Sequence, residues 1–506
     1  MMKNLQNTTL IILLFCAIEL ILHVIADFHS GFHSDELLHI ATGRHPSFGY
    51  MEFPPIIGWL AWIQDRVGSA SVFMHHLFTH MATLLILMLV GLTTIELGGK
   101  SKAVFMALLC ILISPGFDRS HQLFQPVVFS ELFWVLSFYI LVKFVKTPDS
   151  KNLFYLTIVL AFGFLSKYDI VFFIAGLSGL LAFTHTRQIL LSRQVWKFIL
   201  LFFILVAPNL WWQYLYGFPM LKMFSRLYET QLNKLNVGGV IRELVIDLNP
   251  ITLFIWVPGL YYMFNRKLKA LFLPVAVCIT LSILVLALAK GKHYYFFSDI
   301  LFLVMFGSIW FEQKILSQRK WVFYPVSTLF IFTGLLLLPW GLMVLPLKSF
   351  ISVYKLKTGE SKFGIPDEYY SENKWAKTMT AIKTVYDSLP AKEKQHCLIW
   401  GKHYSQAGAV DLLGKNYGLP NGFSYHGSFY IWAPSGPMPE TVIAFTNGEA
   451  GIDFFQNYFD SVTAVKEVLN PYADFEKDQY QTIYVCKQPK QSFDKMKILF
   501  KDRVFE

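Results

Sequence analysis

Long apolar segments separated by short polar ones make up the first two thirds of this 506-residue chain. A helix needs about 20 residues to cross the hydrocarbon core of a bilayer, and somewhat fewer where it is short or bent. Apolar runs of about that length cover residues 9–26, 72–96, 103–116, 124–145, 153–166, 168–184, 198–216, 248–264, 270–289, 296–311 and 321–345. The pattern predicts a mainly α, polytopic membrane protein with about eleven transmembrane helices.

One polar interruption leaves two local structures open. The sequence Ser166-Lys167-Tyr168-Asp169 falls between the runs 153–166 and 168–184. It fits one long helix that carries charges, or two helices that meet at a tight polar corner.

The pattern changes after residue 346. The tail carries charges, Gly and Pro residues and short β-like runs typical of strands at 441–445 and 482–485. A helical pattern covers 371–388, and another helix is expected after Gly401. We therefore expect a transmembrane domain over 1–346 and a soluble α/β domain over 347–506. Cys397 and Cys486 lie in this tail, and the sequence does not decide between a disulfide and free thiols.

Composition supports lipid as the solvent of the first part. The chain is 54% hydrophobic and only 15% charged, against about 25% charged in a typical soluble protein. Its net charge of +10 comes from short basic clusters between apolar runs, which is typical of topology signals and argues against nucleic-acid binding. These clusters are Lys3; Lys100 and Lys102; Lys146 and Lys151; Arg187 and Arg193; Arg266, Lys267 and Lys269; Lys314, Arg319 and Lys320.

The basic clusters also predict the orientation of the chain. Since short loops rich in Lys and Arg stay in the cytoplasm, the alternate loops face outward. An odd number of helices then places the loop 27–71 and the tail from about residue 346 outside the membrane.

The loop 27–71 is the first candidate for chemistry. It contains His33-Ser34-Asp35-Glu36 and, further on, Glu52-Phe53-Pro54-Pro55. Ser34 or Asp35 would cap a short helix over 35–43, and Pro54-Pro55 would begin a second, interfacial helix. Asp35, Glu36 and Glu52 are candidate catalytic carboxylates, although acids at a helix start also interact favourably with the helix dipole.

Basic and aromatic polar residues near the outer ends of other helices form a second candidate group. Cations there run against the orientation rule, so each either extends toward the interface or has an anionic partner. The group that we expect to bind a phosphate consists of Lys167, Arg226, Lys292, His293, Tyr294 and Tyr295. A divalent metal is an open question, because His33, Asp35, Glu36 and His39 offer ligand atoms without forming a defined metal motif.

Several segments resemble the bacterial PMT-type glycosyltransferases, a family of protein O-mannosyltransferase-like and aminoarabinose-transferase-like enzymes with the GT-C fold. The most specific is Asp35-Glu36-Leu37-Leu38-His39 through Gly49-Tyr50-Met51-Glu52-Phe53-Pro54-Pro55, which resembles the first extracytoplasmic loop of the family. Weaker similarities follow in order along the chain. They lie at Ser166-Lys167-Tyr168, Pro208 to Gln213, Lys292-His293-Tyr294-Tyr295, Tyr404 to Ala409 and Tyr430 to Pro434.

The resemblance implies transfer of a sugar from a polyprenyl-phosphate donor to a lipid, glycan or protein acceptor. The enzyme would lie in the bacterial inner membrane, with its tail in the periplasm and membrane lipids around it. Asp35 would act as the general base, with Glu36 beside it and Glu52 shaping the site. Relatives often carry Lys or His after this second acid, whereas here Phe53 follows, so a phosphate contact made there in relatives has no counterpart.

Two other classes of function are consistent with a membrane protein of this kind. A transporter or flippase of lipid-linked sugars would show repeated halves and ionisable groups at the bilayer midplane, whereas this chain shows no internal repeat. An assembly or receptor protein that acts through its tail would not need so many helices as an anchor. The identity of the sugar, the acceptor and the oligomeric state cannot be read from the sequence.

Overall fold

A computed structural model describes residues 2–68, 71–357, 364–448, 451–473 and 476–506. Residues 69 and 70 of the predicted first loop lie outside the described residues. The chain divides into two compact units. The first comprises residues 1–25, 53–56 and 77–344, and the second comprises 26–52, 57–76 and 345–506, so that most of the first loop belongs with the tail.

Apolar helices make up the first unit. Within the described residues, seven are long and apolar enough to cross a membrane. They are Gln6–Asp27 in α1 (Met2–Asp27), α4 (Val72–Glu96), α7 (Pro126–Lys146), α11 (Arg193–Leu215), Leu271–Leu288 in α15 (Arg266–Leu288), His293–Ile315 around α16 (Phe297–Trp310) and Lys320–Gly341, which contains α17 (Phe323–Gly341). The protein is therefore a multi-pass, mainly helical membrane protein, as predicted.

The remaining predicted spans are bent or short. Helices α5 (Ser101–Leu112) and α6 (Pro115–Gln122) meet at 71°, and Ile170–Ala182 meets α10 (Thr184–Leu190) at 118°. Two shorter apolar helices cover Ser150–Ser166, which is α8, and Pro250–Tyr262, which includes α14 (Leu253–Tyr262). With these four, each predicted apolar run has a helical counterpart.

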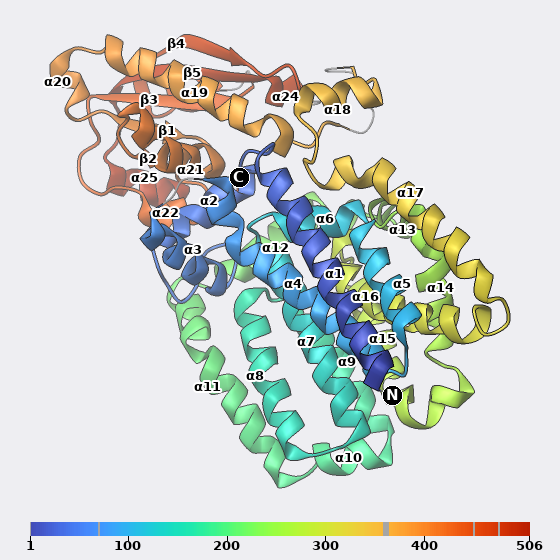
Figure 1. The fold of residues 1–506 in the computed structure, drawn as a ribbon. Coiled ribbons are helices and arrows are strands. Elements are labelled where there is room, and N and C mark those ends of the chain that lie inside the picture. The colour runs from blue at the N-terminus through green and yellow to red at the C-terminus, as the bar shows by residue number, and fades with distance from the viewer. Residues whose placement is uncertain (1, 69–70, 358–363, 449–450, 474–475) are drawn as a thin grey trace. The chain divides into compact units, whose positions relative to one another are not determined.

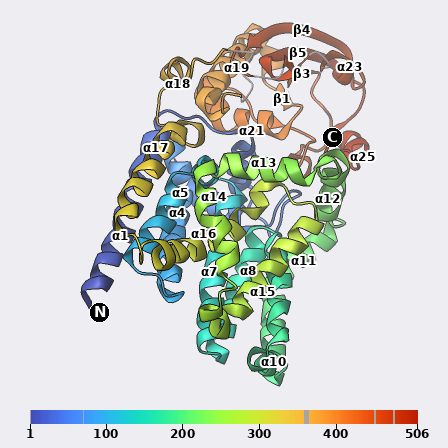
Figure 2. The same ribbon diagram turned by 90° about the vertical axis from the view of Figure 1, so that its right-hand side faces the viewer.

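The polar corner consists of two helices. Helix α8 ends at Ser166, and α9 (Ile170–Leu177) begins after Asp169. The hydroxyl of Ser130 donates a 2.6 Å hydrogen bond to Oδ1 of Asp169, so the corner is held against α7. Helix α7 packs against both α8 and α15, as Figure 2 shows.

Glycines permit close contact between two helices of this unit. A Cβ atom at Gly259 of α14 would lie 2.0 Å from the carbonyl oxygen of Leu303, and one at Gly307 of α16 would lie 1.9 Å from that of Ile255. Without a hydrophobic effect between helices in lipid, such close backbone packing is a main source of association. The connections that are predicted to face outward contain α12 (Pro219–Thr230), η3 (Leu232–Lys234), α13 (Val237–Asp247) and η5 (His293–Phe296).

The second unit contains a five-stranded sheet with the order β2-β1-β3-β5-β4 (Figure 1). Strands β1 (Leu398–Gly401), β2 (Gly422–Phe423) and β3 (Thr441–Asn447) are parallel, whereas β5 (Tyr480–Pro489) runs antiparallel to β3 and to β4 (Phe459–Leu469). The strands predicted at 441–445 and 482–485 are thus confirmed.

Helices cover this sheet and hold its core. Alternate residues of β3, Val442 and Ala444, pack in a core with residues of α23 (Gly451–Gln456) and α25 (Phe493–Phe500). The unit also contains α18 (Leu347–Tyr354), α19 (Glu368–Ser388), α20 (Ala391–Lys394), α21 (Tyr404–Leu413), η8 (Gly414–Tyr417), α22 (Phe429–Trp432) and α24 (Glu476–Gln479). Cys397 and Cys486 are buried and free, which answers the question that the sequence left open.

The first loop contributes α2 (Ser34–Ala41), η1 (Thr42–Arg44) and α3 (Ile56–Val67) to this second unit. Helix α2 packs closely on α21, because a Cβ at Gly408 would lie 2.6 Å from the carbonyl oxygen of Leu37. Both predicted helices of the loop are present. The predicted cap is wrong, however, because His33 rather than Ser34 or Asp35 is the N-cap residue of α2.

Candidate functional site

The start of α2 positions Asp35. Nδ1 of His33 accepts a 3.1 Å hydrogen bond from the backbone N–H of Asp35, and the carboxylate of Glu36 accepts a 2.7 Å bond from the backbone N–H of His33. This reciprocal capping box fixes the first turn of the helix, although its cap residue is a histidine instead of the usual Ser or Thr. The Asp35 side chain is left available for other contacts and is 45% exposed.

Asp35 binds a residue of the tail. The hydroxyl of Tyr404 donates a 2.7 Å hydrogen bond to Oδ1 of Asp35. Partial burial would raise the pKa of Asp35, but His33 and the Tyr404 hydrogen bond, with smaller contributions from His39 and His403, hold this pKa below its usual range. Asp35 is therefore an accessible carboxylate that stays ionised at neutral pH.

Tyr404 begins a second helix capped by histidine. Nδ1 of His403 accepts a 3.3 Å bond from the backbone N–H of Ser405, and the side chain of Gln406 accepts a 2.9 Å bond from the backbone N–H of His403. The ring of Tyr404 lies 3.9 Å from that of His403 and 4.9 Å from that of His426. Burial lowers the pKa of His403 to about 4, so this ring is neutral at pH 7.

Glu36 lies in a buried network. Its Oε1 is 2.7 Å from Nε2 of His76, whose Nδ1 is 2.6 Å from Oδ1 of Asp27. Asp27 lies at the end of α1 and His76 in the first turns of α4, so the network ties the two ends of the loop to α2. The side chain of Glu36 is fully buried, which suits a fixed structural contact better than contact with a substrate.

Glu52 holds the turn before α22. Its Oε1 accepts a 2.8 Å bond from the backbone N–H of Ser428, and its Oε2 accepts a 2.5 Å bond from the hydroxyl of Ser428. Burial raises the pKa of Glu52 to about 7 against the opposing effect of these bonds. Gly427 makes the contact sterically feasible, since its φ is +59° and a Cβ there would lie 1.8 Å from Oε1 of Glu52.

A cluster of ligand atoms includes only one residue of the predicted metal set. His33, Asp367 and Glu368 each present an atom, and these atoms lie within 4.8 Å of one another. Nε2 of His33 is 3.6 Å from Oδ1 of Asp367. The carboxylate of Glu36 already binds His76 and the backbone N–H of His33. Metal binding by the set His33, Asp35, Glu36 and His39 stays a prediction.

The first unit brings together part of the predicted phosphate-binding group. Nζ of Lys167 is 2.8 Å from Oδ2 of Asp169 and lies 4.5 Å from the ring centre of Tyr295 and 5.6 Å from that of Tyr294. Lys292 lies 5.9 Å from the ring centre of Tyr294. Tyr294 therefore links two cations that are distant in sequence.

The other members of this group have different surroundings. Lys292 donates a 2.6 Å bond to the side chain of Gln231, and His293 lies 2.9 Å from Glu243 and 2.8 Å from Asp247. Arg226 is exposed on α12, and the contacts described for Lys167 and Lys292 do not include it. The structure thus groups Lys167, Lys292, Tyr294 and Tyr295 but not Arg226.

Sequence reasoning missed the partners that the tail supplies. In the sequence, Tyr404 stands out only as part of a family-like segment, and no pattern indicates that His403, His426 or Ser428 lies near the loop. One local signal for the cap was present, because His403-Tyr404-Ser405-Gln406 has the spacing of a capping box, as His33-Ser34-Asp35-Glu36 does.

Comparison with known proteins gives a family match and a fold. Residues 52–212 match the family described as dolichyl-phosphate-mannose-protein mannosyltransferase. The search of curated proteins gave no match.

Among solved structures, ArnT from Cupriavidus metallidurans bound to undecaprenyl phosphate is similar, with a TM-score of 0.56 and 13% identity over 94% of this chain and 97% of ArnT. Its apo form gives the same TM-score and coverage at 11% identity. The arabinofuranosyltransferase AftD from Mycobacteria has a TM-score of 0.54 and 11% identity over 95% of this chain and 40% of AftD. At these identities the structural likeness establishes the fold.

Proposed function

We propose that this chain is a glycosyltransferase of the PMT- and ArnT-like GT-C group and that it moves a sugar from a polyprenyl-phosphate donor to an acceptor hydroxyl or phosphate. The acceptor is part of a lipid, glycan or protein, and the reaction takes place at the outer face of a bacterial inner membrane with the tail in the periplasm. One observation carries the proposal: Asp35 is accessible, held in place by Tyr404 and ionised.

Asp35 is suited to the part of a general base. A base must be ionised before the reaction and within reach of the proton that it takes, and Asp35 meets the first condition because its pKa is low. As the acceptor oxygen attacks the anomeric carbon, Asp35 takes its proton. The bond from that carbon to the phosphate oxygen breaks, and polyprenyl phosphate leaves with the electron pair. A single displacement of this kind inverts the anomeric centre.

The leaving phosphate requires cations, and Lys167 and Lys292 with Tyr294 and Tyr295 would supply charge and hydrogen bonds. Arg226 and His293 would then help to bind the donor and would take no part in the reaction itself. The mechanism requires Asp35 and Lys167 to reach the same donor molecule, and this spatial requirement is part of the proposal.

The test uses cells that lack the protein and are complemented with variants. Mass spectrometry of envelope glycolipids and glycoproteins identifies the sugar mass that the wild type adds. Asp35→Asn should lower this modification by about two to four orders of magnitude, the usual contribution of a general base. Asp460→Asn, which changes an exposed carboxylate on β4, is the control and should leave modification unchanged.

Two outcomes would contradict the proposal. Unchanged modification with Asp35→Asn would remove Asp35 from the reaction. A wild-type protein that moves polyprenyl-linked sugar across vesicles, with no sugar mass added to any envelope component, would instead indicate a flippase.

A further inference from the structure

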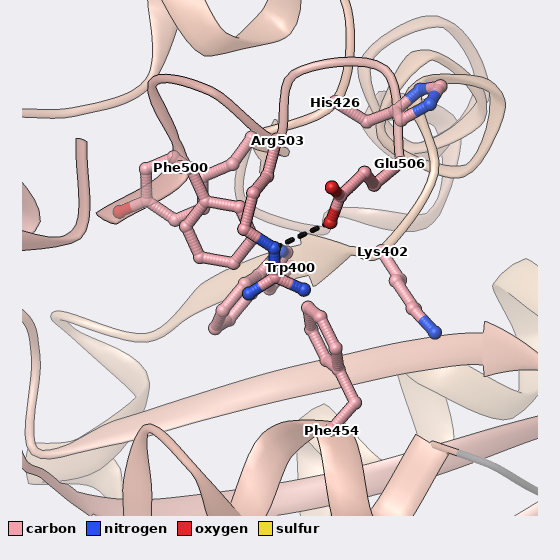
Figure 3. Close-up of a pocket in the computed structure, with 8 residues that line it drawn as sticks. Trp400, Lys402, His426, Phe454, Phe500, Arg503 and Glu506 are labelled. Carbon is pink, nitrogen blue, oxygen red and sulfur yellow. Dashed lines mark hydrogen bonds and ion pairs between the residues drawn. The ribbon is translucent and has the colours of Figure 1, made fainter. Parts of the chain in front are cut away.

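A pocket in the tail lies apart from the contacts used so far. It is a cavity of about 140 Å³ lined by Trp400, Lys402, His426, Phe454, Arg503 and Glu506 and by two more aromatic residues, Tyr425 and Phe500 (Figure 3). These residues come from β1 and the segments that follow β1, β2 and β3, and from the end of the described chain, and all belong to the second unit.

The charges around this pocket are unbalanced. Nε of Arg503 is 2.7 Å from the carboxylate of Glu506, so this pair is neutral overall. Lys402 has no carboxylate within 4.0 Å among the described residues, and its Nζ lies 4.6 Å from the ring centre of Phe454. One positive charge is therefore left without an anion beside a partly apolar cavity.

The pocket disfavours the charged form of Lys402. Burial and the nearby Arg503 both lower the pKa of Lys402. Contact with an aromatic ring offsets only part of the lost hydration of an ammonium group. A second cation, Arg503, lies over the ring of Phe500 at 5.3 Å and is also held by the hydroxyl of Tyr458 at 3.1 Å, so it is fixed in place. An anion bound in the pocket beside Lys402 would offset this unbalanced charge.

The cavity has room for a small anion. Its volume of about 140 Å³ admits several water molecules, and a phosphate group also fits in it. Phosphate can also accept bonds from the planar guanidinium and the ammonium group at once. We propose that this pocket binds a phosphate group through Lys402 and Arg503.

The pocket adjoins the proposed base. His426 lines it, and the ring of His426 lies 4.9 Å from that of Tyr404, which donates to Asp35. A phosphate held there on a sugar would place the rest of that sugar near the start of α21. Assignment of the phosphate to an acceptor rests on the proposed function, whereas phosphate binding itself does not.

The binding experiment uses the full-length protein in detergent and no donor. Inorganic phosphate and glucose 1-phosphate are titrated by calorimetry at low ionic strength. Lys402→Gln should raise the dissociation constant at least tenfold, and Lys402→Arg should restore most of the affinity. Lys383→Gln removes a partly exposed cation on α19 and is the matched control. Thermal unfolding of each variant shows that the fold is retained.

The two probes distinguish the sources of the phosphate. Tighter binding of glucose 1-phosphate supports a phosphorylated sugar, and equal binding of both supports free phosphate as the ligand. Binding that is absent, or equal in wild type and Lys402→Gln, overturns the proposal. Loss of sugar transfer in Asp35→Asn with phosphate binding intact would leave both proposals standing, whereas transfer that persists in that variant would overturn only the role of Asp35.

Discussion

The hydroxyl of Tyr404 donates a hydrogen bond to the carboxylate of Asp35 across a separation of 369 residues in sequence. It connects the first turns of two helices, α2 and α21, that are both capped by a histidine. The bond both orients the Asp35 side chain and stabilises its ionised form, so its removal should change a rate and a pH dependence together.

Tyr404→Phe tests this double role. A hydrogen bond to a charged group contributes about 1.5–3 kcal/mol, so transfer at neutral pH should fall by about tenfold to a hundredfold. Without the bond the pKa of Asp35 rises, and a larger fraction of the carboxyl is protonated at a given acidic pH. The acid limb of the pH–rate profile should therefore move to higher pH. Tyr480→Phe, on an exposed ring, is the control.

Lys167 should matter for transfer beyond its pairing with Asp169. Lys167→Met leaves Asp169 without its cation and should lower both the unfolding temperature and the rate of transfer. The double variant Lys167→Met with Asp169→Asn removes both charges and keeps an acceptor for Ser130, so stability should return. Transfer should stay low, because the leaving phosphate still lacks a cation. Recovery of transfer in the double variant would reduce Lys167 to a structural residue.

Substitutions at Gly427 and Gly418 distinguish the backbone strain caused by an added side chain from its steric clash with a neighbour. Both have positive φ, +59° and +64°, but only Gly427 has an atom, Oε1 of Glu52, in the position of a Cβ. Gly418→Ala should cost about 1–2 kcal/mol of unfolding free energy, the usual penalty of the left-handed conformation. Gly427→Ala should cost more, because it also displaces the Glu52 carboxylate. Denaturant or thermal unfolding measures the difference, and equal costs would contradict the contact.

The stability of the tail should depend on pH through His403. Its pKa is about 4 in the folded protein, below the value of 6.5 for a free histidine. The unfolded chain therefore binds the extra proton first, and the stability that this residue contributes above pH 6.5 is lost as the pH falls toward 4. His403→Asn keeps a good N-cap residue and removes the titration. The fall of its unfolding temperature between pH 7 and 4 should be shallower than that of the wild type.

The membrane helices could be predicted from sequence because each one satisfies its backbone hydrogen bonds within its own segment. A run such as 124–145 has to satisfy its backbone hydrogen bonds within itself in lipid, so hydropathy alone locates α7 at Pro126–Lys146. The corner at Ser166 to Asp169 is consistent with one helix or two in the sequence, because the residue that binds Asp169, Ser130, lies on another helix.

The candidate site could be predicted only in part, because its partners are distant in sequence. The acidic loop identified Asp35, Glu36 and Glu52, but the three differ in ways that no local pattern reveals. Glu36 binds His76, Glu52 binds Ser428, and Asp35 binds Tyr404. The bonds of Glu52 and Asp35 depend on how the loop folds against residues 345–506, and that of Glu36 depends on how the loop folds against the start of α4. Whether Asp35 and the cations around Lys167 reach one donor stays a prediction.

The packing of α2 on α21 at Gly408 sets an order of events during biosynthesis. The segment with Asp35 leaves the ribosome more than 350 residues before the helix that bears Tyr404. Throughout elongation of the intervening spans, that early loop lacks the surface on which it will rest. The contact between Asp35 and Tyr404 thus forms only when both ends of the chain have been made, and a chain released before residue 404 would lack the hydroxyl that binds the proposed base.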